Sequence, residues 1–410
     1  MNLPDSIAKS PVVFLTGAGA SVALGRLVTR EFWDHIKQVL FATSVDANGA
    51  MRDFRTSLMA DFSATDADIE AVLSHLEQSA ERAEHLAKDR FFLERVLHKH
   101  EAELDQYVAW NRTVRDLIYD QVIDHYSSID AGDAAVLYRP LLKDYSLWFQ
   151  PVAGVGHTIP LFTLNYDTAV ELAASSLGVR LVDGLDHHRG ATENRWRQAA
   201  FENYVESSDE TAVVLIKLHG SVRWGRISGG NAEARASDAI VELPHFVGRD
   251  PGRHTHAVLY PSLSPKPLEA EPFHTGYRIF RRCLDSARIL IVIGCSMRDP
   301  EIQVAVSDSM DDNRELHLLL FGPETDHEIM ARSLHVDPAR VAAVRGRFEA
   351  VEYRDGQSSF MGCIRGYAAS AVGDSNARAS FSFGATRDYL TPEVPALSRW
   401  SAANTKSQIS

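Results

Sequence analysis

The stretch Val12-Val13-Phe14-Leu15-Thr16-Gly17-Ala18-Gly19-Ala20-Ser21 decides the fold, because an apolar run passes directly into a glycine-rich turn. The run predicts a buried strand, and the apolar pattern over residues 32–40 predicts a helix after the turn. In an open α/β sheet, ligands bind at the turns that follow the carboxyl ends of strands. Backbone N–H groups of such a turn suit a diphosphate, with a tight turn that binds no ligand as the alternative. Val22 stands where the hydride-transfer fingerprint has its third glycine, so the turn is not typical of a dehydrogenase.

A second strand end carries polar side chains. Thr163-Leu164-Asn165-Tyr166-Asp167 follows the apolar run Ile159-Pro160-Leu161-Phe162. Thr163, Asn165 and Asp167 alternate along an otherwise buried segment, so we expect their side chains to share one face. An Asn and an Asp on a neighbouring turn can reach a ribose or a water, and the two turns together predict a dinucleotide pocket with reactive groups beside it. The alternative is an Asx-type turn, in which these side chains bond their own backbone.

Two further strand ends add a base and a wall of small residues. Leu218-His219-Gly220-Ser221 follows an apolar run, and a His in that place suits a general base, with a structural His as the alternative. Ile293-Gly294-Cys295-Ser296 ends another apolar run, and Asp299 follows closely. Small residues there would let an adenosine ribose lie against the backbone and bond Ser296, with a plain packing strand end as the alternative. Cys295 has no evident base partner, so a nucleophilic role is not favoured.

The spacing of the apolar runs predicts the fold class. We predict an α/β protein with a doubly wound, mostly parallel Rossmann-like sheet and a helical insertion after the first strand-helix unit. Residues 213–216 are apolar throughout, as in a central strand covered on both faces. Residues 225–257 are rich in Gly, Ser, Asp and Arg and predict a surface loop. The further strand-like runs cover residues 159–162, 179–182, 258–260, 289–293 and 316–321.

The predicted insertion divides the chain into three parts. Ile69, Val72, Leu73 and Leu76 repeat at the spacing of an amphipathic helix, and we interpret this stripe as core. We therefore predict a discontinuous core of residues 1–49 and 150–371, a helical insert of residues 50–149 and an extended C-terminal tail of residues 372–410. The tail is interpreted as lying on a neighbouring subunit, with partial disorder as the alternative.

Composition limits the class of protein. The 410 residues carry a formal net charge of −13, which does not favour nucleic-acid binding over the whole surface. Cys283, Cys295 and Cys363 form no CxxC pair, which argues against a disulfide framework or zinc ribbon and favours the cytoplasm. His187-His188 and His254-Thr255-His256 lack a suitably spaced third ligand, so we expect no metal. No apolar stretch is long enough to span a bilayer, and we expect no membrane contact.

Four of these motifs occur in sirtuin order and resemble the sirtuin NAD-binding core: residues 17–21, residues 163–167, His219-Gly220-Ser221 and Gly294-Cys295-Ser296. The resemblance is closer to bacterial sirtuin-like antiphage-defence proteins, through Asp68-Ile69-Glu70, Val182-Asp183-Gly184 and Tyr260-Pro261 with Lys266. It covers roughly residues 11–325. Two features differ: the paired CxxC motifs of the zinc module of protein-deacylating sirtuins are absent after the His motif, and Val28 stands where Pro is common in the family.

The resemblance implies roles for these residues. Gly17, Ala18, Gly19 and Ser21 would hold the diphosphate of NAD, Asn165 and Asp167 would face the nicotinamide ribose, and His219 would be the base. The predicted catalytic set is therefore Asn165, His219 and Asp167. The predicted NAD-binding set is Gly17, Ala18, Gly19, Ser21, Thr163, Gly294, Ser296 and Asp299. NAD is the expected substrate, without a metal.

The predicted reaction is NAD glycohydrolysis to nicotinamide and ADP-ribose. An enzyme of this kind would drain the cell of NAD, so we expect the NAD-depleting effector of a bacterial antiphage defence system, kept off until triggered. Related systems use a separate nucleic-acid-directed ATPase or Argonaute as sensor, and the insert and tail are the expected surfaces for a homo-oligomer. Two other functions stay open: an NAD-dependent protein deacylase, which the missing zinc module disfavours, and a non-catalytic NAD or ADP-ribose sensor.

Overall fold

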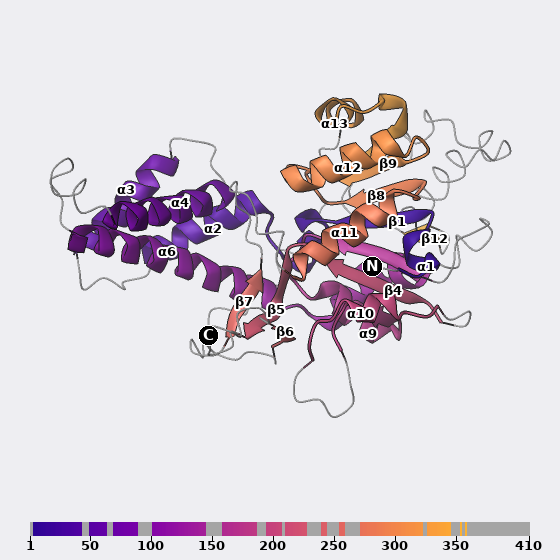
Figure 1. Ribbon diagram of the computed structural model, residues 1–410, viewed down its shortest axis with the longest axis horizontal. Helices are drawn as coiled ribbons and strands as arrows, with labels where there is room; N and C mark the ends of the chain where they lie inside the picture. The colour runs from indigo at the N-terminus through magenta and orange to yellow at the C-terminus, as the bar shows by residue number, and fades with distance from the viewer. Residues whose placement is uncertain are drawn as a thin grey trace.

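The computed structural model shows a helical arm beside an α/β lobe (Figure 1). It describes residues 3–42, 49–63, 69–88, 101–144, 158–186, 194–206, 210–227, 239–243, 254–258, 271–322, 326–345, 353–354 and 357–358. The predicted tail at 372–410 lies outside the described residues, as do His187-His188, Asp68, Tyr260-Pro261 and Lys266.

The α/β lobe is built on a seven-stranded sheet with the order β10-β9-β8-β1-β2-β4-β3. All of its pairings are parallel, which confirms the predicted doubly wound, Rossmann-like α/β fold. The chain runs outward from β1 through β2 and β4, then returns to the other side of β1 with β8, so the direction of winding reverses between β1 and β8. The strands are β1 (Val12–Thr16), β2 (Thr158–Thr163), β3 (Arg180–Val182), β4 (Ala212–Lys217), β8 (Ile289–Ile293), β9 (His317–Gly322) and β10 (Val341–Arg345).

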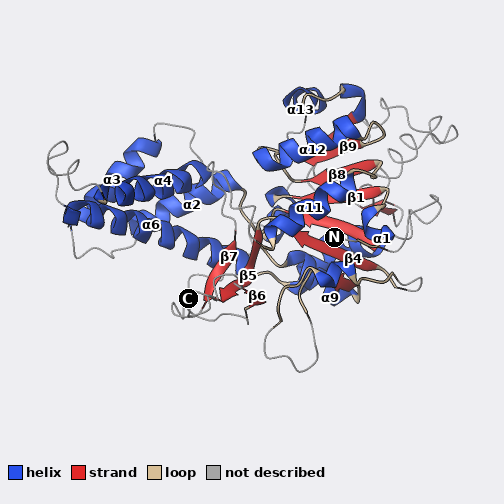
Figure 2. Ribbon diagram, viewed as in Figure 1, coloured by secondary structure: helices blue, strands red, loops and turns tan. Residues whose placement is uncertain are grey.

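Helices cover both faces of this sheet (Figure 2). Successive side chains of a strand point to opposite faces, so in β1 Val13 and Leu15 pack on one side and Val12 and Phe14 on the other. Each such fully buried side chain contributes about 1.5–3 kcal/mol to folding. The first face meets α1 (Asp5–Ala8), α11 (Phe273–Leu284), α12 (Pro300–Asp312) and α13 (His327–Ser333), and the second meets α7 (Ala131–Arg139), the short turn η3 (Pro140–Asp144) and α9 (Ala169–Leu177). The short helices α10 (Ala199–Glu202) and η5 (Pro338–Arg340) complete the lobe.

The helical arm includes part of the predicted insertion and has a core of its own. The stripe of Ile69, Val72, Leu73 and Leu76 is buried, as predicted. The same cluster includes Tyr166 and Val222 of the α/β lobe, so the arm packs directly on the segments after β2 and β4. The division into core and insert stays a prediction. The helices of the arm are α2 (Thr29–Ala42), α3 (Gly49–Ser63), α4 (Ile69–Ala87) and α6 (Glu101–Ser127).

A small antiparallel sheet lies where the sequence predicted a surface loop over residues 225–257. Its order is β6-β5-β7, formed by β6 (Ala239–Glu242), β5 (Gly220–Ile227) and β7 (His254–Val258). That prediction was wrong for the described residues. Of the predicted strand-like run at residues 258–260, Val258 belongs to β7, which pairs with β5, and the rest lies outside the described residues. Trp224 of β5 and Ile240 of β6 form a small buried cluster, against which Trp196 packs. Elsewhere, β11 (Tyr353–Arg354) and β12 (Gln357–Ser358) form a short antiparallel pair.

Among the described helices, none combines the length and the apolar character that crossing a bilayer requires.

The closest approach of backbone in the sheet is between the turns after β1 and β8. A Cβ on Gly17 would lie 2.8 Å from Cα of Cys295, and one on Gly19 would lie 2.8 Å from Cα of Gly294. Gly294 has φ +61°, and a Cβ there would overlap the backbone N of Ala20. Glycine is therefore required on both turns by packing, and at Gly294 also by its left-handed conformation.

We expect Gly294→Ala to destabilise the protein far more than Gly178→Ala. Gly178 has a similar φ of +65° at the end of α9, but a Cβ there would meet nothing within 4 Å. Gly178→Ala should therefore cost only the strain of a left-handed residue, about 1–2 kcal/mol. Gly294→Ala adds overpacking and should cost about 1–3 kcal/mol more. Chemical denaturation of both variants measures the difference, and equal losses would contradict the packing explanation.

Candidate functional site

The register of the sheet brings the four sequence motifs to one level. Thr16 pairs with Thr163 on β2 and with Ile293 on β8, and Thr163 pairs with Lys217 on β4. The turns after these strands therefore start side by side at the carboxyl edge of the sheet. The reversal of winding between β1 and β8 makes this the place where ligands bind in open α/β sheets.

The glycine turn differs from its predicted form in one respect. The N–H of Gly17 donates to the carbonyl of Ile293 at 2.9 Å, and the N–H of Gly19 donates to the carbonyl of Gly294 at 2.8 Å. These two amides already hold the turns together, so their N–H groups are not left bare for a diphosphate. The turn also leads into the 3-10 helix η1 (Ala18–Leu24), and the predicted α-helix follows separately as α2.

A cavity of about 570 Å³ opens over these turns. This volume lies within the range of small-molecule pockets. Of the predicted site residues, those that line the cavity are Gly17, Ala18, Gly19, Asn165, His219, Gly294, Ser296 and Asp299. Ser21, Thr163 and Asp167 are buried beside it and do not line it. Of the three side chains expected to share one face, Asn165 is therefore the one that lines the cavity.

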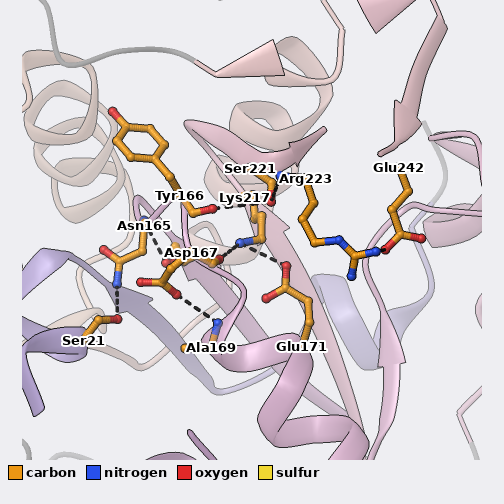
Figure 3. A network of polar contacts seen from close by, with 11 residues as sticks. Ser21, Asn165, Tyr166, Asp167, Ala169, Glu171, Lys217, Ser221, Arg223 and Glu242 are labelled. Atoms are coloured by element: carbon orange, nitrogen blue, oxygen red, sulfur yellow. Dashed lines mark hydrogen bonds and ion pairs between the residues drawn. The ribbon is translucent and has the colours of Figure 1, made fainter. Parts of the chain in front are cut away.

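Ser21 and Thr163 instead hold Asn165 in place. The side-chain amide of Asn165 donates to Oγ of Ser21 at 3.1 Å, and its backbone N–H donates to Oγ1 of Thr163 at 3.0 Å (Figure 3). Asn165 is 7% exposed, so its amide is fixed in a nearly dry wall. The hydroxyl of Ser21 therefore fixes the side-chain amide of Asn165, which lines the cavity, and the hydroxyl of Thr163 fixes the backbone of the same residue.

A buried ion pair supports the same turn from below (Figure 3). Nζ of Lys217, at the end of β4, lies 3.0 Å from Oε1 of Glu171 on α9 and also donates to the backbone carbonyl of Asp167. Burial raises the pKa of Glu171, and the ammonium of Lys217 opposes that shift. The Asp167 carboxylate accepts the N–H of Ala169 at 3.0 Å, at the start of α9. Lys217 therefore ties strand β4 to the turn that carries Asn165.

His219 makes a side-chain contact with a carboxylate that the sequence did not predict. Its Nε2 lies 2.9 Å from Oδ2 of Asp299, and both side chains are 8% exposed. The hydroxyl of Tyr277 on α11 lies 3.5 Å from the same nitrogen. Burial raises the pKa of Tyr277, and the carboxylates of Asp299 and Glu301 add to that shift, so the hydroxyl stays protonated. His219 therefore faces the cavity next to a fixed carboxylate.

The helical arm forms the apolar wall of the cavity, which sequence analysis missed. Phe32, Ile69, Leu73, Val122 and Tyr126 line it from α2, α4 and α6. The stripe on α4 was the available signal, but two of its residues, Ile69 and Leu73, line the cavity as well as belonging to the core. Tyr166, Arg298 and Asp326 also line the cavity and were not predicted, although each lies close after a strand of the sheet.

The arm also fixes the loop between η1 and α2. The backbone N–H of Leu27 donates to Nε2 of His125 at 3.0 Å, and the hydroxyl of Tyr126 donates to the carbonyl of Leu27 at 3.0 Å. The next residue, Val28, lines the cavity. Burial lowers the pKa of His125 to about 4, with the charges of Arg26 and His35 adding to the shift. The end of α6 thus holds the loop at the cavity wall through both the N–H and the carbonyl of one residue, Leu27.

Comparison with known proteins gives a family match for part of the chain around this cavity. Residues 160–338 match the family model described as a SIR2-like domain. The match confirms the sirtuin-like resemblance of the sequence, while the closer likeness to defence proteins stays a prediction. The matched span starts after β1 and its glycine turn, which the sheet nevertheless places against β8 of that span.

The structure is similar to solved Sir2 homologues. One is a mutant Sir2 homologue in complex with ADP-ribose, with 15% identity, coverage of 90% of this chain and 96% of that chain, and a TM-score of 0.35. Another is a Sir2 homologue in complex with NAD, with 15% identity, coverage of 90% and 93%, and a TM-score of 0.37. A comparison with curated proteins gives no match to this sequence.

We expect Lys217→Met to destabilise the protein by about 3–5 kcal/mol, because it leaves the buried Glu171 carboxylate without its counter-charge. The double variant Lys217→Met/Glu171→Leu should recover much of this loss. The matched control is Lys9→Met, because Lys9 and Asp5 are also 3.0 Å apart but 67% and 77% exposed. Lys9→Met should cost about 0–1 kcal/mol. Denaturant unfolding measures all three, and a double variant no more stable than Lys217→Met would contradict the explanation.

We expect the clamp on Leu27 to weaken in acid. The pKa of His125 falls from 6.5 in the unfolded chain to about 4 in the folded protein, so stability is lost as pH falls from about 6.5 towards 4. Protonation also removes the acceptor for the Leu27 N–H. His125→Gln offers a carbonyl acceptor that does not titrate. Denaturant unfolding at pH 7 and pH 5 measures the stability difference between the wild type and His125→Gln. This difference should shift in favour of the variant at pH 5. A difference that is independent of pH would contradict this.

Proposed function

We propose that the protein hydrolyses NAD to nicotinamide and ADP-ribose. The observation that carries the proposal is that Asn165, His219 and the glycine turn line one cavity, at the point where the winding of the sheet reverses. Several strands of this sheet lie in the span that matches a SIR2-like domain. The sensor alternative requires only binding, and it gives no reason for a hydrogen-bonded amide and an imidazole paired with a carboxylate in the same wall.

The cavity wall suits an extended dinucleotide. Backbone of Gly17, Gly19 and Gly294 forms a smooth surface on which a ribose or diphosphate can lie closely. Arg298 lines the cavity and supplies a cation for the diphosphate, and Ser296 supplies a hydroxyl for a ribose. The aromatic and aliphatic side chains of the arm offer an apolar surface for the nicotinamide end.

The chemistry needs little beyond positioning and charge stabilisation. The bond between C1′ of the ribose and the nicotinamide nitrogen breaks, and its electron pair leaves with neutral nicotinamide. The oxocarbenium-like ribose then bonds the oxygen of a water, whose proton passes to His219 and afterwards to solvent. Asn165, held by Ser21 and Thr163, orients that water.

We also propose that this activity is held off until the protein is triggered. Unregulated hydrolysis would exhaust cellular NAD, which fits an NAD-depleting effector of a bacterial antiphage defence system. The resemblance of the motifs to sirtuin-like defence proteins supports this role. The trigger is then self-assembly or a sensor protein, and the arm is the proposed surface for both because it also forms a wall of the cavity.

Purified protein, assayed in each of its assembly states, should in at least one of them release nicotinamide and ADP-ribose from NAD without any acylated peptide. We expect Asn165→Ala and His219→Ala each to lower kcat/KM by about 10²–10⁴-fold, as for loss of a water-orienting group or a general base. His85→Ala, an exposed histidine of the arm, is the control and should leave the rate unchanged. Chromatography of the products measures the reaction. Turnover only with an acyl-lysine peptide would favour a deacylase, and tight binding without turnover in every assembly state would favour a sensor.

A further inference from the structure

The carboxylate of Asp299 makes two kinds of contact at once. Its Oδ1 accepts the N–H groups of Glu301 and Ile302 at 3.1 and 3.3 Å, which makes it the N-cap of α12. Its Oδ2 lies 2.9 Å from Nε2 of His219. The cap fixes the rotamer of the carboxylate, and the positive end of α12 stabilises its charge. The second oxygen is therefore presented to the imidazole in a fixed direction.

We propose that Asp299 is a positioning residue that orients His219 and stabilises its protonated form during the proposed NAD hydrolysis, on which this inference rests. An ionised carboxylate accepts hydrogen bonds only, so Nε2 of His219 carries the proton and donates it to Asp299. In the neutral ring the lone pair is then on Nδ1. This assigns Asp299 a different role from the contact with NAD that the sequence predicted.

The proton balance of the step follows from this tautomer. The water that bonds C1′ gives its proton to Nδ1, and the neutral ring becomes an imidazolium with Nε2–H still donated to Asp299. The carboxylate stays ionised throughout, and the extra proton later passes from Nδ1 to solvent. The ion pair is thus strongest in the state in which His219 holds the proton taken from the water.

Two tyrosines also lie near the His219 ring. The Tyr277 hydroxyl on α11 lies 3.5 Å from Nε2, and the Tyr166 ring, after β2, is 6.4 Å from the imidazole between centroids. Cys295 and Glu301 belong to the segment that carries Asp299, and both act on Tyr277. Asp299 makes the shortest of the contacts to Nε2, so its charge is the one that governs the ring.

Asp299→Asn tests the contact with His219 separately from the cap of α12. Asn is as good an N-cap as Asp and should keep α12 intact, whereas its neutral amide removes the charge and donates to Nε2 instead of accepting from it. We expect kcat to fall about 10²-fold or more, the KM for NAD to change less than 3-fold or so, and the acid limb of the kcat/KM profile to move to lower pH by about one unit. The last sign follows because a carboxylate favours the imidazolium, and its loss lets the ring lose its proton at lower pH.

Two control variants match this one. Asp130→Asn changes the N-cap of α7, where Oδ1 accepts the N–H groups of Gly132 and Asp133 at 2.8 and 3.0 Å, and should leave activity and pH profile unchanged. Tyr277→Phe removes the longer contact to Nε2 and should have a much smaller effect than Asp299→Asn. A rise in the KM for NAD with an unchanged acid limb would overturn the proposal in favour of a direct contact between Asp299 and NAD.

A second readout does not need turnover. Nitrogen NMR of the His219 ring in the full-length protein reports which nitrogen carries the proton and at what pH the ring titrates. We expect the Nε2–H tautomer in the wild type, and Asp299→Asn should change the tautomer and lower the titration midpoint. An unchanged spectrum would overturn the inference even if NAD is hydrolysed. The expected spectra in a protein that never hydrolyses NAD would uphold the pairing and overturn only the proposed function.

Discussion

The close contact between the turns after β1 and β8 is the constraint on which the site depends. Gly17 and Gly19 donate their amides to carbonyls of Ile293 and Gly294, and no side chain fits between the two turns. This contact closes the gap at the point where the winding of the sheet reverses. The backbone of Gly17, Gly19 and Gly294 thereby forms a floor of the cavity.

The reactive side chains are placed on this floor by buried partners, not by the ligand. Asn165 is held by two hydroxyls, its turn by Lys217, and His219 by Asp299. Each partner belongs to a different strand end or helix start, so a shift of one element would disturb a particular hydrogen bond. In a nearly dry wall these bonds are stronger than in water, and the orientation of the site exists before substrate arrives.

Sequence analysis found the strand ends and the residues on them because both signals are local. An apolar run that changes to Gly, Asn or His identifies a buried strand and its turn, and parallel register then brings the turns together. It missed the antiparallel sheet after His219 because the composition of this segment, rich in Gly, Ser and Arg, is typical of a loop. It also assigned Asp299 to the cofactor and not to His219. The pairing joins β4 to α12, and nothing in the spacing of the two residues along the chain indicates it.

The arm is the part of the structure that the sequence predicted least completely. Under the proposed function, it is also the part best placed to control access to the cavity. An amphipathic stripe indicates that a helix is buried, but it does not indicate what lies against each end of the stripe. In the structure the stripe continues from the core of the arm to the cavity, and α6 ends on the peptide of Leu27 beside it. A displacement of α6 would therefore move the loop and the apolar wall together, while Asn165 and His219 keep their partners in the sheet. Under the proposed function, a partner that binds the arm would therefore act on the cavity wall without disturbing the partners of Asn165 and His219.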